Sequence, residues 1–299
     1  MPDRASAGAD GAASVDGAAS VGTLFVVSTP IGNLGDVTLR ALEVLRAVPL
    51  IAAEDTRVAA RLLARYEIDT RTVSFHARSG PDRRERLLGH LRGGENLALV
   101  TDAGTPVVSD PGDDLVAAWA REGGRVVPIP GPSAVLAAVA ATGLAGPRWT
   151  FEGFLPRSGR ERKERLARIA GDERASVLFE APTRLAASLR DLAGACGPDR
   201  IAAVCRELTK VHEQIVRGTL DELIEHVASG AIPARGEIVV VVAGATPAAL
   251  SAEPDAERDL EAARGMVDAL ARAGTSRADA AKAVAAATGI PRRKLYGGG

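Results

Sequence analysis

The stretch VTDAGTPVVSDPG, from Val100 to Gly112, leads from a short apolar run directly into a loop of small, polar and proline residues. The run from Leu97 to Val100 has turn-forming residues on both sides, a pattern typical of a buried parallel strand. The glycines of the loop permit unusual backbone angles, and its prolines make it stiff. Because ligands of open α/β sheets bind beyond the carboxyl ends of the strands, this loop is predicted to line a ligand site. A rigid strand-to-helix turn that binds nothing is the alternative.

Short apolar runs alternate with amphipathic segments on both sides of this loop. They predict strands over residues 24–27, 50–53, 72–75, 97–100 and 126–129. Helices are expected between these strands, and Pro81 is predicted to open the third of them with Ser79 as its cap. Strands that alternate with helices in this way predict one parallel sheet covered on both faces.

A second α/β unit is expected to follow a helix that starts at Ser133. Its strands are predicted over residues 151–155, 177–179, 201–205, 213–217 and 238–243. Thr183 is the expected cap of the helix that runs to Ala195, and Thr219 with Glu222 forms the capping box of the next helix. No helix fits between the third and fourth of these strands, so the sequence predicts an antiparallel hairpin and a mixed sheet.

The predicted fold class is therefore α/β, with two α/β domains and a small helical piece at the carboxyl end. The expected division is a disordered tail over 1–22, domains over 23–132 and 133–244, a linker over 245–255 and helices over 256–299. The tail has neither the basic start nor the apolar core of a signal peptide. In the helical piece, Ser276 is expected to cap one helix and Pro291 to open the last turn.

Composition limits the classes of partner. The formal net charge is −1, from 37 basic and 38 acidic residues, so any RNA-binding surface must be a local patch. Two cysteines are too few for a disulfide framework and, with four scattered histidines, make no zinc spacing. No metal site is predicted, and a reducing cytoplasmic compartment is expected. No stretch approaches the roughly 20 apolar residues that cross a bilayer, so no membrane partner is expected.

Three further loops of the first unit follow predicted strands and suit ligand binding. STPIGNLGD, residues 28–36, is a glycine-rich loop whose free backbone donors can hold polar or anionic groups, although it is neither a dinucleotide fingerprint nor a P-loop. AEDTR, residues 53–57, carries two acids that can bind ribose hydroxyls, with helix capping favoured for at least one. PIPGPSA, residues 128–134, is rigid backbone at a helix start.

The second unit places charges directly after its strands, in FEGFLPR (151–157), FEAPTR (179–184) and CRELTK (205–210). At these positions carboxylates and ammonium groups can touch a substrate in a cleft. The alternative is an internal ion pair, either Glu180 with Arg206 or Glu207 with Arg184. His76, after the third strand of the first unit, is a weaker candidate because a lone histidine there is more often only hydrogen-bonded.

A basic run follows FEGFLP and predicts either a surface that contacts RNA phosphates or an ordinary solvated face. Its members singled out for RNA binding are Arg157, Arg160, Arg162 and Lys163.

Together, in order and spacing, seven motifs resemble the ribosomal RNA small subunit methyltransferase I family of the tetrapyrrole methylase class. They are STPIGNLGDVTLRALEVL, AEDTR, VTDAGTPVVSDPG, PIPGPSA, FEGFLPR, CRELTK followed by HEQIVRGTL, and GEIVVVV. The resemblance runs from about Thr23 to Gly244, and SRADAAKAVAAATGIPRRKLY resembles the family's helical carboxyl-terminal piece. It implies a class III S-adenosylmethionine-dependent enzyme, with the cofactor in the cleft between two α/β domains of a homodimer. The implied reaction is methyl transfer to the ribose 2′-oxygen of a cytidine in the decoding region of 16S rRNA, on the small ribosomal subunit.

The resemblance also implies which residues meet the cofactor. These are Pro30, Gly32, Asp102, Ala103, Gly104, Thr105, Ser133 and Ala134. The chain departs from the family at Thr183, where relatives often have histidine, and after His76, where Ala77 replaces the more usual histidine. These departures weaken any essential role for those two positions.

Attack by a hydroxyl on a sulfonium methyl requires alignment and a proton acceptor. Glu207 or Glu180 is the predicted acceptor, and Lys210 or Arg206 is predicted to lower the pKa of the hydroxyl or to hold the adjacent phosphate. A methyltransferase acting on a porphyrin-like macrocycle is the alternative enzyme, but it would need a wide apolar cleft floor. A non-catalytic nucleotide- or RNA-binding module is a further alternative, and the missing fingerprint disfavours a nicotinamide dehydrogenase.

Overall fold

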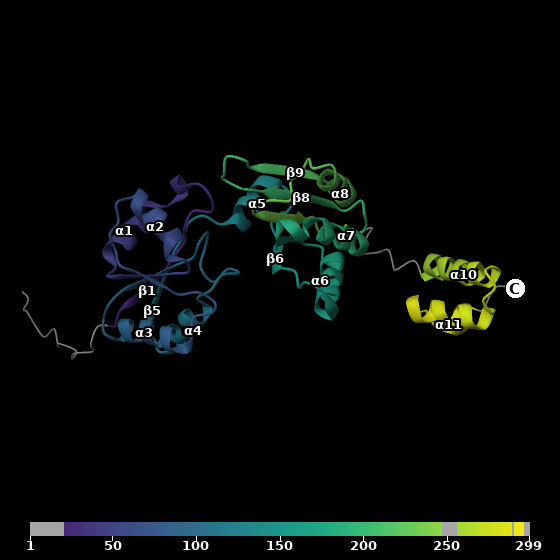
Figure 1. Ribbon diagram of the computed structural model, residues 1–299, viewed down its shortest axis with the longest axis horizontal. Coiled ribbons are helices and arrows are strands. Elements are labelled where there is room, and N and C mark those ends of the chain that lie inside the picture. Colours follow the sequence, from purple (N-terminus) through teal and green to yellow (C-terminus); the bar gives the residue numbers. More distant parts are fainter. Residues whose placement is uncertain (1–20, 247–255, 289, 296–299) are drawn as a thin grey trace, which may run out of the picture.

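The structure is a computed structural model that describes residues 21–246, 256–288 and 290–295 (Figure 1). The tail predicted over 1–22 therefore falls almost wholly outside the described residues, as does the linker predicted over 245–255 beyond residue 246.

The first unit is the predicted parallel sheet, in the order β3-β2-β4-β1-β5. Its strands are β1 (Thr23–Val27), β2 (Leu50–Ala53), β3 (Thr72–Ser74), β4 (Leu97–Val100) and β5 (Arg125–Ile129). Its helices are η1 (Leu34–Asp36), α1 (Leu39–Ala47), α2 (Thr56–Arg65), α3 (Pro81–Arg92) and α4 (Asp113–Arg121). Figure 1 shows α1 and α2 on one side of this sheet and α3 and α4 on the other. Because successive strand residues face opposite sides, Ala98 joins the core under α1 and α2 while Leu99 joins the core under α3 and α4.

The second unit is the predicted mixed sheet, in the order β6-β7-β10-β8-β9, with only β6 and β7 parallel. Its strands are β6 (Trp149–Phe154), β7 (Ala175–Glu180), β8 (Ile201–Arg206), β9 (Gln214–Thr219) and β10 (Ile238–Val242). Its helices are α5 (Ala134–Thr142), α6 (Gly159–Gly171), η2 (Pro182–Arg184), α7 (Leu185–Cys196) and α8 (Leu220–Ala228).

Helix α5 covers one face of this second sheet, and α6, α7 and α8 cover the other. Val135 and Ala138 of α5 are buried in one cluster with Val177 and Val239 of the sheet. We therefore propose that the domain boundary lies at Ser133, which gives the division into 23–132 and 133–244.

In the two α/β units, two predicted helix caps are confirmed and two are wrong. Ser133 accepts a hydrogen bond from the Leu136 amide, and Thr219 forms the full capping box. Ser79 caps nothing, because Pro81 is already the first helical residue and Gly80 occupies the cap position. Thr183 lies inside the 3₁₀ turn η2, which Pro182 begins, so α7 starts one residue later than expected, with Arg184 at the cap position.

The helices α10 (Ala256–Arg272), α11 (Arg277–Thr288) and α12 (Arg292–Leu295) share a small apolar cluster that includes Val267, Val284 and Leu295. Ser276 caps α11 as predicted, by accepting a hydrogen bond from the Asp279 amide over 3.2 Å. Within the described part of the chain, no helix combines the length and apolar character needed to cross a bilayer.

Candidate functional site

A cavity of about 450 Å³ lies where the strand ends of the two units meet. The first unit contributes Glu54 after β2 and the segments 102–105 and 108–110 after β4. The second unit contributes residues 133–135 at the start of α5 and 236–239 at the start of β10. Six of the eight residues predicted to meet a cofactor line this cavity: Asp102, Ala103, Gly104, Thr105, Ser133 and Ala134.

The loop after β4 is tied to the loop after β1. Thr29 and Gly104 exchange both backbone hydrogen bonds, over 2.8 and 3.0 Å, and the hydroxyl groups of Ser28 and Thr105 share a hydrogen bond of 2.9 Å. Gly104 has a φ of 79°, in the left-handed region that glycine adopts without strain. The base of the loop that was predicted to be stiff is thus held by hydrogen bonds to the loop after β1 and by the left-handed backbone of Gly104.

The middle of this loop is strained. Val107 and Ser109 have φ angles of 76° and 65°, and a left-handed backbone is unfavourable for a β-branched residue such as valine. Such strain persists only where the surroundings enforce it, and it concentrates at functional sites. Here it sets the path of Val108, Ser109 and Asp110 along the cavity.

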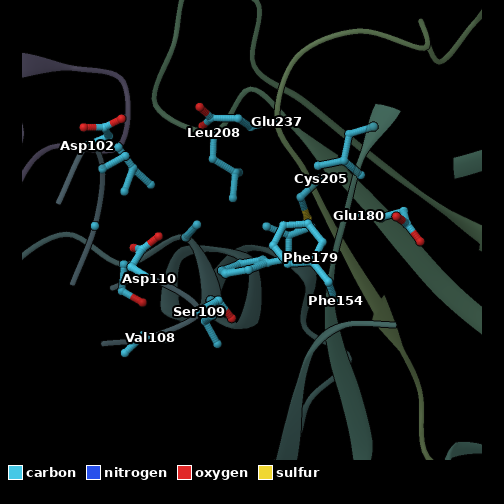
Figure 2. A pocket seen from close by; sticks show the side chains of 18 of the residues that line it. Asp102, Val108, Ser109, Asp110, Phe154, Phe179, Glu180, Cys205, Leu208 and Glu237 are labelled. Atoms are coloured by element: carbon cyan, nitrogen blue, oxygen red, sulfur yellow. The ribbon is translucent and has the colours of Figure 1, made fainter. Parts of the chain in front are cut away.

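Three acids line the wall that the first unit contributes, namely Glu54, Asp102 and Asp110. Figure 2 labels Asp102 and Asp110. Burial, followed by the negative charge of Glu54, raises the pKa of Asp110 to about 6. Burial also raises the pKa values of Glu54 and Asp102. Burial disfavours the charged form of these carboxylates, and a positive charge nearby would stabilise that form. The wall therefore favours a cationic ligand group. Asp102 was predicted here, whereas Asp110 was not singled out.

The opposite wall, from the second unit, is apolar. Phe154 and Phe179 face the acids across the cavity, together with Leu208 (Figure 2). The ring of Phe179 meets those of Phe151 and Phe154 with centroids 5.0 and 5.6 Å apart. Two of the charged groups that follow these strands, on Glu180 and Arg206, are turned into the second unit.

Glu180 illustrates this inward orientation. Its side chain is buried and accepts hydrogen bonds from the Ala181 amide, over 2.8 Å, and from the Ser188 hydroxyl. Its carboxylate also pairs with Arg184 over 3.3 Å, and in Figure 2 it points away from the acids of the opposite wall. Arg206 is buried too, and donates to Gln214 and to the His212 carbonyl.

Both predicted ion pairs are wrong. Glu180 pairs with Arg184 instead of Arg206, and Glu207 pairs with Lys210 instead of Arg184. Each acid finds its base three or four residues further along the chain, in the turn that follows its strand. A local partner of this kind closes a much shorter loop than a partner from another strand does.

A second cavity of about 290 Å³ adjoins the first, since Ile31, Asp102, Ala103 and Glu237 line both. Pro30 and Gly32, the other two predicted cofactor residues, line this second cavity, as do Arg61 and Lys210.

Lys210 links the two units at this junction. Its stem lies over Gly32, so that a Cβ on Gly32 would fall 2.3 Å from the Lys210 Cγ. Its ammonium group pairs with Glu207 at 2.9 Å and with Glu237 at 3.2 Å. Desolvation alone would lower the pKa of Lys210, but these hydrogen bonds and charges outweigh it and raise the pKa.

Glu207 is correspondingly fixed. It has a φ of 52° and accepts hydrogen bonds from the Lys210 ammonium and from the Glu237 amide, both over 2.9 Å. The bond from Lys210, followed by that from Glu237, lowers its pKa. Lys210 therefore remains a cation at neutral pH, and Glu207 is a weak proton acceptor.

The basic run divides into a buried and an exposed part. Arg162 is only 7% exposed and donates to Asp191, Ser188 and the Pro156 carbonyl over 2.8–3.0 Å. It belongs to the fold of the second unit and does not present itself to RNA. Arg160, Arg157 and Lys163 are exposed. Arg160 forms an ion pair with Glu164. In the described part of the chain, Arg157 and Lys163 form no ion pair.

Comparison with known proteins relates the whole assembly to methyltransferases. Residues 23–224 match the family model of Tetrapyrrole (Corrin/Porphyrin) Methylases. The chain is 45% identical to Ribosomal RNA small subunit methyltransferase I of Synechocystis sp., over 92% of this chain and 96% of that protein. It is 46% identical to the protein of the same name from Xylella fastidiosa, over 93% of this chain and 98% of that protein.

Two solved structures have the same fold. The methyltransferase CobJ has a TM-score of 0.58 at 22% identity, over 75% of this chain and 95% of that one. Uroporphyrin-III C-methyl transferase from Thermus thermophilus, complexed with S-adenyl homocysteine, has a TM-score of 0.54 at 21% identity, over 74% of this chain and 97% of that one. At these identities the structural likeness establishes the fold alone.

Proposed function

The chain belongs to the ribosomal RNA small subunit methyltransferase I family, within the tetrapyrrole methylases, and from this premise we propose that it is an S-adenosylmethionine-dependent rRNA methyltransferase. Its acceptor is the ribose 2′-oxygen of a cytidine in the decoding region of 16S rRNA. The observation that carries the proposal is 45–46% identity over nearly the whole length of two curated relatives. The acceptor atom and the nucleotide rest on the family resemblance.

The first cavity suits the cofactor. S-adenosylmethionine supplies a methyl group on a positively charged sulfur, and it also carries an ammonium group and an adenine. The acids Glu54, Asp102 and Asp110 complement the positive charges, and the apolar wall around Phe179 and Leu208 suits the adenine. The tied loop at Gly104 brings polar backbone groups close to the ligand. Pro30 and Gly32 would contact the cofactor from the adjoining second cavity.

Lys210 is proposed to act on the acceptor. It remains a cation at the junction of the two cavities, where it can hold an RNA phosphate or lower the pKa of the 2′-hydroxyl. Glu207 is its positioning residue, because it holds the ammonium group at 2.9 Å. Glu180 and Arg206 are left out of the proposed machinery, since their charged groups are buried and bonded within the second unit.

Asp110 is the proposed proton acceptor. Its carboxyl faces the first cavity, and a pKa of about 6 lies near the value at which a general base is most effective at neutral pH (Figure 2). Glu207, by contrast, is held ionised by Lys210 and has a lowered pKa.

The proposed partner is the small ribosomal subunit, met through the exposed cations Arg157, Arg160 and Lys163. A cytoplasmic location and a homodimer complete the proposal. Both rest on the family resemblance.

A tetrapyrrole methyltransferase is the second candidate. The apolar wall with Phe154 and Phe179 favours it, because a macrocycle would pack on such a surface. The full-length relatives favour rRNA, and the structure of uroporphyrin-III C-methyl transferase is only 21% identical to this chain.

The test is transfer of labelled methyl from S-adenosylmethionine to purified small subunits that lack the modification. Mass spectrometry of the digested RNA should identify 2′-O-methylcytidine. If the protein binds S-adenosylmethionine in calorimetry but labels only a uroporphyrinogen-type macrocycle, the second candidate replaces the first. Binding of NAD and not of S-adenosylmethionine would overturn both.

A further inference from the structure

Guanidinium groups fix the segment that follows β6. Its three successive carbonyls each accept a hydrogen bond from an arginine: Phe154 from Arg165 over 3.2 Å, Leu155 from Arg184 over 2.7 Å, and Pro156 from Arg162 over 2.8 Å. These arginines come from α6 and from η2, so two separate elements hold the segment from one side. Residues 154–156 are consequently a rigid ledge at the rim of the first cavity.

The ledge presents an aromatic ring. Phe154 is 49% exposed and lines the cavity (Figure 2), and its ring is tilted by 56° to the ring of Phe179. Within the described residues, Phe154 is the only exposed aromatic among the large hydrophobic side chains, in a chain that is only 3% aromatic. Burial of an aromatic ring is strongly favourable, so half-exposure on a rigid ledge indicates a surface that another molecule covers.

Positive charge follows this ring along the chain. Arg157 comes directly after the ledge, and Lys163 lies about one turn into α6. In the described part of the chain, both side chains are exposed and neither forms an ion pair or hydrogen bond. An aromatic platform flanked by unpaired cations is the combination that binds single-stranded nucleic acid, through base stacking and phosphate contacts.

A nucleotide that reacts inside a cavity must leave its stack, and the lost stacking has to be replaced. We propose that the base of the acceptor nucleotide stacks on Phe154 while Arg157 contacts the adjacent phosphate. In this arrangement Phe154, at the rim, contacts the base of the incoming nucleotide, and Phe179, further inside the cavity, contacts the adenine of the cofactor. This inference rests on the proposed function and deepens it, by naming the group that receives the unstacked base.

The test compares Phe154→Ala, Phe154→Leu and Phe154→Trp with the wild type, using unmodified small subunits as substrate. Phe154→Ala should lower kcat/KM for the subunit about 5- to 100-fold, the range given by base stacking on an aromatic side chain. Phe154→Trp should keep most of the activity. Phe154→Leu, which keeps apolar packing on Phe179 without a ring face, should lose most of it. Calorimetric affinity for S-adenosylmethionine should stay within about twofold in all three.

Leu39→Ala is the matched control, because Leu39 is 79% exposed on α1 and lines neither cavity. Its kinetics should equal those of the wild type. Wild-type kinetics in both Phe154→Ala and Phe154→Leu would overturn the inference. A loss of affinity for S-adenosylmethionine with unchanged KM for the subunit would also overturn it, by assigning the ring to the cofactor. Failure of the wild type itself to label rRNA would instead refute the proposed function.

Discussion

Gly32 and Lys210 come from different units, yet the position of the Lys210 side chain requires glycine at residue 32. The Lys210 stem occupies the space that a side chain on Gly32 would need. The family resemblance assigned Gly32 to the cofactor, but the structure gives a second reason for glycine at this position. A glycine whose absent Cβ makes room for a distant residue cannot be recognised from neighbouring sequence, because the contact spans 178 positions of the chain.

Gly32→Ala is therefore expected to act through Lys210. The added Cβ should displace the ammonium group from the junction of the cavities, and lower kcat about 10-fold or more. Lys210→Ala should cause a similar loss, and the double variant should lose little more than either single one. Single-turnover methylation assays measure this cycle. Gly89→Ala, where a Cβ meets nothing within 4 Å, is the control, and additive losses in the double variant would refute the coupling.

The acids of the first cavity could not be assembled from sequence for a different reason. Glu54 follows β2 and Asp102 follows β4, and they become neighbours only because these strands pair in the sheet. Strand order is a property of the whole sheet, and the apolar runs of parallel strands carry no mark of which strand pairs with which. Loops could thus be predicted one by one, whereas the wall they form together could not.

Asp110→Asn should reveal how much the ionised Asp110 carboxylate lowers the free energy of unfolding. Burial raises the pKa of Asp110 from 3.8 to about 6, so between these values the folded protein keeps a proton that the unfolded chain has released. The free energy of unfolding of the wild type should consequently fall as pH rises through this window. Above pH 6 the asparagine variant should be more stable by about 1 kcal/mol, after a discount for the half-exposed carboxyl. Below about pH 4 the advantage should disappear.

Urea unfolding at several pH values checks this stability difference. The same variant tests the role of Asp110 as proton acceptor. The wild-type kcat should show an acidic limb near pH 6, and the limb should be absent from the residual activity of Asp110→Asn. Asp114→Asn, on the exposed start of α4, should leave both profiles as in the wild type.

At the scale of elements, helix α6 shows that a run of basic residues in sequence does not form one basic surface. Its arginines and lysine follow one another in sequence, but 3.6 residues per turn distribute them over opposite faces. Arg162 faces the fold and holds the ledge at Pro156, while Arg160 is 92% exposed on its side chain. Helix and strand boundaries were predicted well, because caps, prolines and apolar runs are local. The orientation of α6 against α7 depends on tertiary packing and was not predictable.

Arg162→Ala should therefore destabilise the protein without acting on RNA directly. It removes the partner of buried Ser188 and of Asp191, and should lower the free energy of unfolding by about 2–4 kcal/mol. Arg160→Ala should change it by less than about 0.5 kcal/mol, since its pair with Glu164 is a surface ion pair. Urea denaturation of both variants decides the matter. Equal stability of the two would show that the Arg162 contacts contribute nothing to the fold.

On the scale of the whole molecule, the two sheets divide the work. The parallel sheet supplies stiff loops and acids to the first cavity, and the mixed sheet supplies an apolar wall and a fixed ledge. The net charge of −1 means that no general attraction draws the protein to RNA, so we expect binding to depend on a local patch, with Arg157, Arg160 and Lys163 as its members. That dependence can be measured through salt.

The variant with Arg157, Arg160 and Lys163 all changed to Glu should bind small subunits more weakly and with a flatter salt dependence. Each lost phosphate contact removes about 0.7–0.9 from the slope of log K against log salt concentration, so the slope should fall by roughly two to three. Its control changes Arg40, Arg86 and Arg121 to Glu, since these are exposed on α1, α3 and α4 and the net charge changes equally. Filter binding at several salt concentrations measures both. A control that flattens the slope as much would show that overall charge, and not the patch beside the ledge, draws the protein to RNA.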